Sequence, residues 1–165
     1  MSALLRLSRA LLALADRLAF VPPLFARVII GVVFTHSGWG KLHNLDQVAR
    51  FFASLGVPAP ELQAPFVAGV ELVCGALVLL GLATRLAAIP LIGTMLVALA
   101  TALAPKITGV NALFGLPELL YIALLVQVAI AGPGALSLDP LVARRLGSRA
   151  SQRLQPASPA GLAKV

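Results

Sequence analysis

Ionisable side chains interrupt the apolar stretches of this sequence at only a few positions. His36 and Lys41 lie at the end of the first apolar stretch, Glu71 lies within the next, and Glu118 begins the last. A charged group inside a membrane-type segment normally faces a partner or a hydrated cavity, because its burial in hydrocarbon is unfavourable. An acid and a base held together there could hydrogen-bond an oxygen atom and exchange a proton with it. The chemistry to consider is therefore proton transfer beside a lipophilic ligand.

These groups are all expected in the outer half of the membrane. If the first apolar helix ends at Leu42 on the outer edge, the helical rise places His36 about 9 Å below that edge. Glu71, six residues into a helix that begins at Pro65, is also about 9 Å deep. Lys41 lies near the edge and can pair with Glu71, which would offset the cost of burying either charge alone. The pair is either a structural link between two helices or the wall of a ligand or proton site.

The remaining candidates have simpler interpretations as well. A single histidine within a membrane helix more often hydrogen-bonds a neighbouring helix than binds a cofactor. Haem would need a second axial ligand, and a metal held by His36 and His43 would need a third ligand from elsewhere. Glu118 follows Pro117 at a helix start, where a carboxylate complements the helix dipole. We therefore predict no metal site.

The elements that must position these groups are membrane helices. The chain has 165 residues, of which 59% are hydrophobic and 12% charged, and its mean hydropathy is +0.97. A soluble domain of this size could not bury so much apolar surface. This composition excludes a soluble enzyme, a disordered protein and a nucleic-acid binder, although the net charge is +7. Cys74 is the only cysteine, which excludes an intrachain disulfide and an internal dithiol.

Four segments are apolar enough to serve as membrane spans, which need roughly 20 helical residues. They run from about 24–42, 65–83, 86–104 and 116–131. Only a tight turn at 81–85 separates the second from the third, so those two must form an antiparallel hairpin. The segment 105–115 is predicted to be a longer loop. The predicted fold class is all-α, an integral membrane four-helix bundle with an N-terminal interfacial amphipathic helix.

Two amphipathic segments flank the first span. In residues 1–23, leucines recur at helical spacing and Arg6, Arg9, Asp16 and Arg17 lie off that stripe, which predicts a helix in the membrane interface. Residues 44–65 contain a short helical pattern whose apolar side is formed by Val48, Phe51, Phe52 and Leu55. We expect this second segment on the outer face, where it either covers a cavity between the spans or shields the end of the bundle.

The basic residues predict the orientation of the chain. Most of the thirteen Lys and Arg residues lie in the N-terminal helix, at Arg85 and in the C-terminal tail. Lys and Arg favour the cytoplasmic side, so both termini are predicted to be cytoplasmic. The sequence thus divides into an amphipathic helix (1–23), a four-span membrane domain (24–139) and a basic cytoplasmic tail, expected to be disordered (140–165).

Five blocks of this sequence resemble the signature of the DoxX family, in order and at the family spacing over about residues 24–139. They are RVIIGVVF at 27–34 with SGWGKL at 37–42, FASLGVPAP at 52–60, GVEL at 69–72 with Gly75, GLATRLAA at 81–88, and GPGALSLD at 132–139. The resemblance implies a small, multi-pass, four-helix protein of the bacterial inner (plasma) membrane. The polar positions that carry over are Arg27, Ser37, Lys41, Glu71 and Arg85; His36 is not one of them.

The resemblance also implies a function. Some members of the family are named as subunits of a thiosulfate:quinone oxidoreductase, and others are linked to redox homeostasis or encoded beside metal-stress systems. We therefore expect a membrane subunit or accessory of a quinone-linked oxidoreductase or of a redox and stress-response system. Its hypothetical quinone and proton site consists of His36, Ser37, Lys41 and Glu71. No cofactor is evident in the sequence itself, which has no flavin, haem or thiol motif, and quinone is the cofactor that the resemblance suggests.

Two alternatives remain open at this level. The protein could be a non-enzymatic scaffold or anchor that recruits a partner protein through its basic tail. The sequence leaves open whether the protein is an enzyme. A small-solute transporter is less favoured, because four short spans without an inverted repeat form a poor transport path. The expected partners are the lipid bilayer and either another protein or further copies of this chain, with no nucleic acid.

Overall fold

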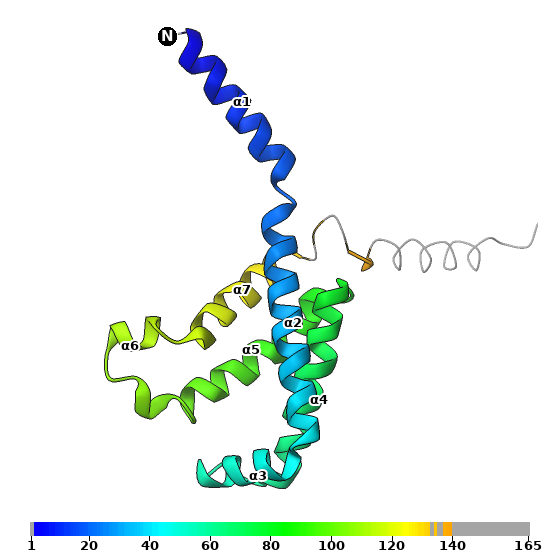
Figure 1. Cartoon of the computed structure of the whole chain (residues 1–165), viewed down its shortest axis with the longest axis vertical. Coiled ribbons are helices and arrows are strands. Elements are labelled where there is room, and N and C mark those ends of the chain that lie inside the picture. The colour runs from blue at the N-terminus through cyan, green and yellow to red at the C-terminus, as the bar shows by residue number, and fades with distance from the viewer. Residues whose placement is uncertain (1, 133, 135–136, 140–165) are drawn as a thin grey trace, which may run out of the picture.

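The computed structural model describes residues 2–132, 134 and 137–139, and these residues form helices joined by short connections (Figure 1). The basic tail at 140–165 lies outside the described residues, so its predicted disorder stays a prediction. The elements are α1 (Ser2–Leu18), α2 (Val21–His43), α3 (Leu45–Ser54), α4 (Pro60–Leu80), α5 (Thr84–Ala100), the short 3-10 helix η1 (Ala104–Lys106), α6 (Val110–Phe114) and α7 (Pro117–Ala131).

Two helical stretches in the described part of the chain are long and apolar enough to cross a membrane. They are Leu7–His43, which includes α2, and α4. The helices α5 and α7 are shorter and also apolar. These elements correspond to the four predicted apolar segments, with ends that differ by a few residues. The protein is therefore an all-α protein with two long apolar helices and further shorter ones.

The ends of α4 differ from the prediction for local reasons. The helix begins at Pro60 rather than near Pro65, because proline suits the first helical position, where its missing N–H has no intrahelical partner. It ends at Leu80, and the next residue, Gly81, has a left-handed φ of 70°. The N–H of Leu82 then donates to the carbonyl of Leu77 (2.9 Å) and that of Gly81 to Val78 (3.1 Å), as in a Schellman motif.

The predicted loop at 105–115 is wrong in part. It contains most of η1 and the single turn α6, which is bounded by Gly109 and Gly115. Between these glycines the apolar residues Val110, Leu113 and Phe114 recur at helical spacing, and the N–H of Gly115 donates to the carbonyl of Asn111 (3.1 Å). The segment is short, but its periodicity favours one helical turn over a plain loop.

Glycines bring α2 and α4 into close contact. A Cβ atom added to Gly38 would lie 2.3 Å from the backbone nitrogen of Leu72, and one added to Gly75 would lie 2.6 Å from that of Thr35. Small residues of this kind allow membrane helices to approach each other closely. The helices α5 and α7 complete the bundle, and its buried core includes Ile30, Phe34, Val78, Leu91, Leu125 and Val128. This packing fixes how far each helix is rotated, and so which side chains face inward.

The segment after α7 returns to the turn between α4 and α5. A carboxylate oxygen of Asp139 accepts a hydrogen bond from the N–H of Ala83 (2.7 Å), and the N–H of Asp139 donates to the carbonyl of Gly81 (3.1 Å). The side chain of Arg27 is buried beside the same turn. This end of the bundle is closed by polar contacts with the backbone.

Candidate functional site

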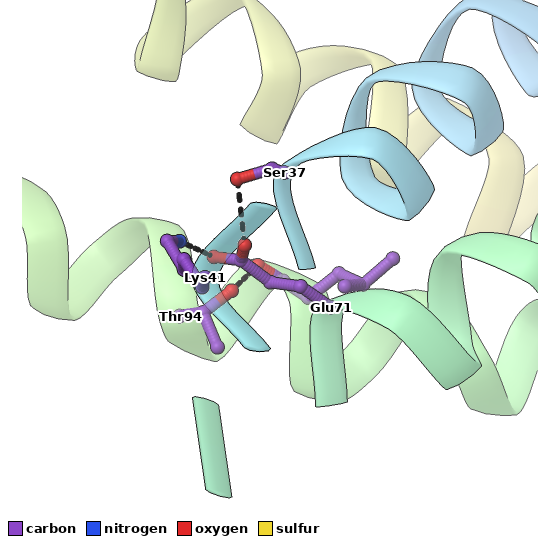
Figure 2. Close-up of polar contacts among 5 residues, drawn as sticks. Ser37, Lys41, Glu71 and Thr94 are labelled. Atoms are coloured by element: carbon purple, nitrogen blue, oxygen red, sulfur yellow. Dashed lines mark hydrogen bonds and ion pairs between the residues drawn. The ribbon is translucent and has the colours of Figure 1, made fainter. Parts of the chain in front are cut away.

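The carboxylate of Glu71 is the centre of a polar cluster within the bundle. The hydroxyl of Ser37 donates a hydrogen bond to its Oε2 (2.8 Å), and Lys41 Nζ forms an ion pair with its Oε1 (2.5 Å; Figure 2). Glu71 is 1% exposed, whereas the Lys41 side chain is 29% exposed. The cluster is therefore anchored inside the protein and reaches an accessible surface through the lysine.

The local sequence explains how these three side chains meet. Ser37 and Lys41 are four residues apart on α2, so they lie one above the other on the same helix face. Gly38 lies between them and brings α2 against Leu72, the residue that follows Glu71 on α4. The pairing of Lys41 with Glu71 that the sequence predicted is thus present.

Beside this cluster lies a cavity of about 510 Å³ that is lined by residues of α2, α3, α4 and α5 and of the segments that follow α3 and α5. Lys41 and Glu71 contribute to its wall, and α3 contributes the apolar side that the sequence predicted, formed by Val48, Phe51, Phe52 and Leu55. Phe51 is 50% exposed and Phe66, on α4, is 68% exposed. The cavity is therefore largely apolar, polar at the Lys41–Glu71 pair, and open at an aromatic rim.

The wall that α5 contributes is smooth and short of free hydrogen-bond donors. Pro90 has no N–H, and a Cβ atom added to Gly93 would meet nothing within 4 Å. The hydroxyl of Thr94 donates to the carbonyl of Leu91 in its own helix (2.8 Å), as Figure 2 shows. A flat apolar group could lie against this wall. These residues were not predicted, although their spacing of three and four residues places them on one helix face.

His36 does not join the other three predicted site residues. Its side chain is exposed on α2 and is not among the residues that line the cavity. Adjacent helical residues point about 100° apart, so when Ser37 faces Glu71, His36 faces outward. His43 contacts Trp39 instead, with ring centroids 4.5 Å apart. No group of three His, Cys, Asp or Glu side chains suited to a metal ion occurs in the described part of the chain.

The two arginines that the resemblance carried over lie at the other end of the bundle. The buried guanidinium of Arg27 packs on Gly81, where an added Cβ atom would lie 2.5 Å from its Nη1. The guanidinium of Arg85 lies against Gly132. Glu118 is half-buried in the first turn of α7 and does not line the cavity. The polar residues therefore form two separate clusters, and only the one at Glu71 adjoins this cavity.

Comparison with known proteins agrees with this architecture. The profile of the DoxX family matches residues 23–104. The chain is 37% identical to the uncharacterized membrane protein Rv3486 of Mycobacterium tuberculosis, covering 76% of this chain and 81% of that protein. It is 34% identical to the "putative oxidoreductase CatD" of Bacillus subtilis, over 72% and 85% of the two chains. It is 30% identical to the inner membrane protein YqjF of Escherichia coli, over 78% and 98%. No solved structure matches the chain.

Proposed function

Because this chain belongs to the DoxX family of membrane proteins, we propose that it is a membrane subunit or accessory of a quinone-linked redox system. In this proposal α2, α4, α5 and α7 span the bilayer, and the cavity beside Glu71 holds the quinone head group. The main observation in support of the proposal is that the ion-paired side chains of Lys41 and Glu71 line a largely apolar cavity of about 510 Å³. Small-molecule sites typically combine such an apolar volume with a few convergent polar groups.

Each polar side chain has a distinct task in this site. Lys41 donates a hydrogen bond to a quinone oxygen, because its ammonium group carries three donors and is part exposed. The Glu71 carboxylate holds that ammonium group in place and exchanges protons with it, while Ser37 orients the carboxylate through Oε2. A bound quinone supplies two-electron, two-proton chemistry. The electrons come from a partner protein, since the sequence carries no flavin, haem or dithiol motif.

Two further observations support this function. The cavity rim includes the exposed rings of Phe51 and Phe66, which suit a ligand that enters from the lipid and leaves its apolar tail there. One relative carries the name "putative oxidoreductase", which is a statement about that protein and favours redox chemistry for this one. The smooth wall at Pro90 and Gly93 suits a planar ring.

The proposal is tested by quinone binding to the purified full chain. The protein is isolated in mild detergent, retained quinone is extracted, and binding of short-chain benzoquinone and naphthoquinone analogues is titrated. We expect Glu71→Gln to weaken binding at least tenfold, because the neutral amide no longer fixes the lysine. His36→Ala is the matched control and should bind as the unmodified chain does. Binding by Glu71→Gln equal to that of the control would contradict the proposal.

A further inference from the structure

The helix α1 exposes an apolar stripe that no other described helix covers. Leu7, Leu11, Leu14 and Leu18 are between 48% and 58% exposed and recur on one side of the helix. Every α1 side chain from Leu7 onward is exposed, and the helix extends away from the bundle beyond the start of α2, to which it is inclined (Figure 1). Exposure of such a stripe to water is unfavourable, so we expect it to be covered by something other than the described helices.

The joint between α1 and α2 is weakly hydrogen-bonded. The N–H of Ala19 reaches the carbonyl of Asp16 at 3.4 Å, and that of Leu24 reaches Phe20 at 3.4 Å, both at the long limit for a hydrogen bond. Pro22 and Pro23 follow and have no N–H to donate. The chain can therefore bend at residues 19–23 while losing few hydrogen bonds.

The length of α2 makes such a bend necessary in a bilayer. Its 23 residues span about 34 Å, enough to cross a hydrocarbon core of about 30 Å without help from α1. A straight continuation would place α1 and its leucines in water beyond the membrane surface. A helix bent along the surface would instead bury that stripe.

We propose that α1 bends at the joint and lies on an anionic lipid surface, on the side of the membrane where α2 begins. Its leucines enter the boundary of the acyl chains, and Arg9 and Arg17 contact lipid phosphates. The positive charge of α1 favours an anionic lipid surface, because the α1 sequence contains three arginines and a single acidic residue, Asp16. Amphipathic helices with arginines beside an apolar stripe bind anionic membranes in this way. The contact is independent of quinone binding at the other end of the bundle.

The test compares two labelled positions on α1 in the full chain. In a Cys74→Ser background, a nitroxide is attached either at Leu11→Cys, on the leucine stripe, or at Ala13→Cys, which lies between Arg9 and Arg17 at helical spacing. The protein is reconstituted into phosphatidylcholine vesicles with or without phosphatidylglycerol. Spin-label accessibility to oxygen, which dissolves in the bilayer, and to a water-soluble nickel complex is then measured.

When phosphatidylglycerol is present, we expect the label at position 11 to be several-fold less accessible to the nickel complex than the label at position 13. Arg9→Gln with Arg17→Gln, or high salt, should reduce that protection, because both weaken the attraction between arginine and phosphate. Equal nickel accessibility at the two positions would overturn the proposal. Protection that is independent of phosphatidylglycerol would also overturn it, because the contact would then not depend on anionic lipid. Dipolar broadening between labels on two copies would overturn it as well, since a second copy of the chain would then cover the stripe.

Discussion

The two ends of the bundle use similar residues to opposite effect. At one end, Lys41 and Ser37 of α2 meet Glu71 of α4 beside a cavity of about 510 Å³. At the other, Arg27 of α2 packs on the turn after α4, and Asp139 bonds to the backbone of the same turn. One cluster borders space that a ligand can use, whereas the other fills its space with protein.

Two glycines show why the ends differ. A Cβ atom on Gly81 would lie 2.5 Å from Arg27 Nη1, and the residue has a left-handed φ of 70° that side chains disfavour. A Cβ atom on Gly93, in the cavity wall, would touch nothing within 4 Å. The first glycine allows close packing, and the second leaves room. A charged residue near a glycine in the sequence is therefore not enough to locate a binding site. A binding site also needs open space beside these residues, which the packing of the helices determines.

The largest expected effect follows from removing the partly exposed cation that pairs with buried Glu71. Lys41→Ala leaves the Glu71 carboxylate, which is 1% exposed, without its cation. We expect a loss of about 3 kcal/mol in the free energy of unfolding, since a buried charge without its partner is strongly destabilising. Thermal unfolding in detergent measures it.

The double variant Lys41→Ala with Glu71→Gln separates stability from binding. It should recover most of the lost stability, because no uncompensated charge remains, but it should not recover quinone binding. A double variant as unstable as Lys41→Ala alone would show that the ion pair is not the source of the loss.

Filling the cavity should affect binding alone. Gly93→Leu places a side chain in open space on the cavity wall, so we expect at least a tenfold loss of quinone affinity with little change in the unfolding temperature. Gly69→Leu is the matched control, because Gly69 on α4 also has open space and does not line the cavity. Similar affinity in both variants would place the quinone elsewhere.

Disrupting the contacts at the opposite end of the bundle should lower stability without changing quinone binding. Asp139→Ala removes the acceptor for the N–H of Ala83, which precedes α5 and has a left-handed φ of 46°. Loss of such a capping bond typically lowers the free energy of unfolding by about 1 kcal/mol. Asp139→Asn keeps an oxygen acceptor and should lose less. Quinone affinity should be unchanged in both, and a clear loss would link the two ends.

The smallest effect is expected at Thr94. Its hydroxyl donates to the carbonyl of Leu91 rather than into the cavity, although the residue lines the wall. Thr94→Val keeps the shape, so stability should change by no more than about 0.5 kcal/mol, as for most substitutions away from special features. Quinone titration should give an affinity close to that of the unmodified chain. A large loss would show that this hydroxyl turns toward the ligand.

Much of the architecture was predictable because hydropathy and periodicity are local properties. The apolar segments gave the helices α2, α4, α5 and α7, and the pattern of Val48, Phe51, Phe52 and Leu55 gave α3. That pattern left open whether α3 covers a cavity or shields the end of the bundle, and the structure places these four residues in the cavity wall. The pairing of Lys41 with Glu71 was expected because the helical rise places both groups in the outer half of the membrane, where an opposite charge offsets the cost of burial.

The sequence by itself therefore determined an apolar, all-helical membrane protein with an acid and a base near the same ends of its first two apolar helices. Only the tertiary structure decided that Ser37 faces inward and His36 outward, because the rotation of α2 depends on its contact with α4 through Gly38 and Gly75. It also decided that α5 supplies a smooth cavity wall and that Asp139 closes the opposite turn. Those features depend on contacts between segments far apart in the chain, which no local pattern encodes.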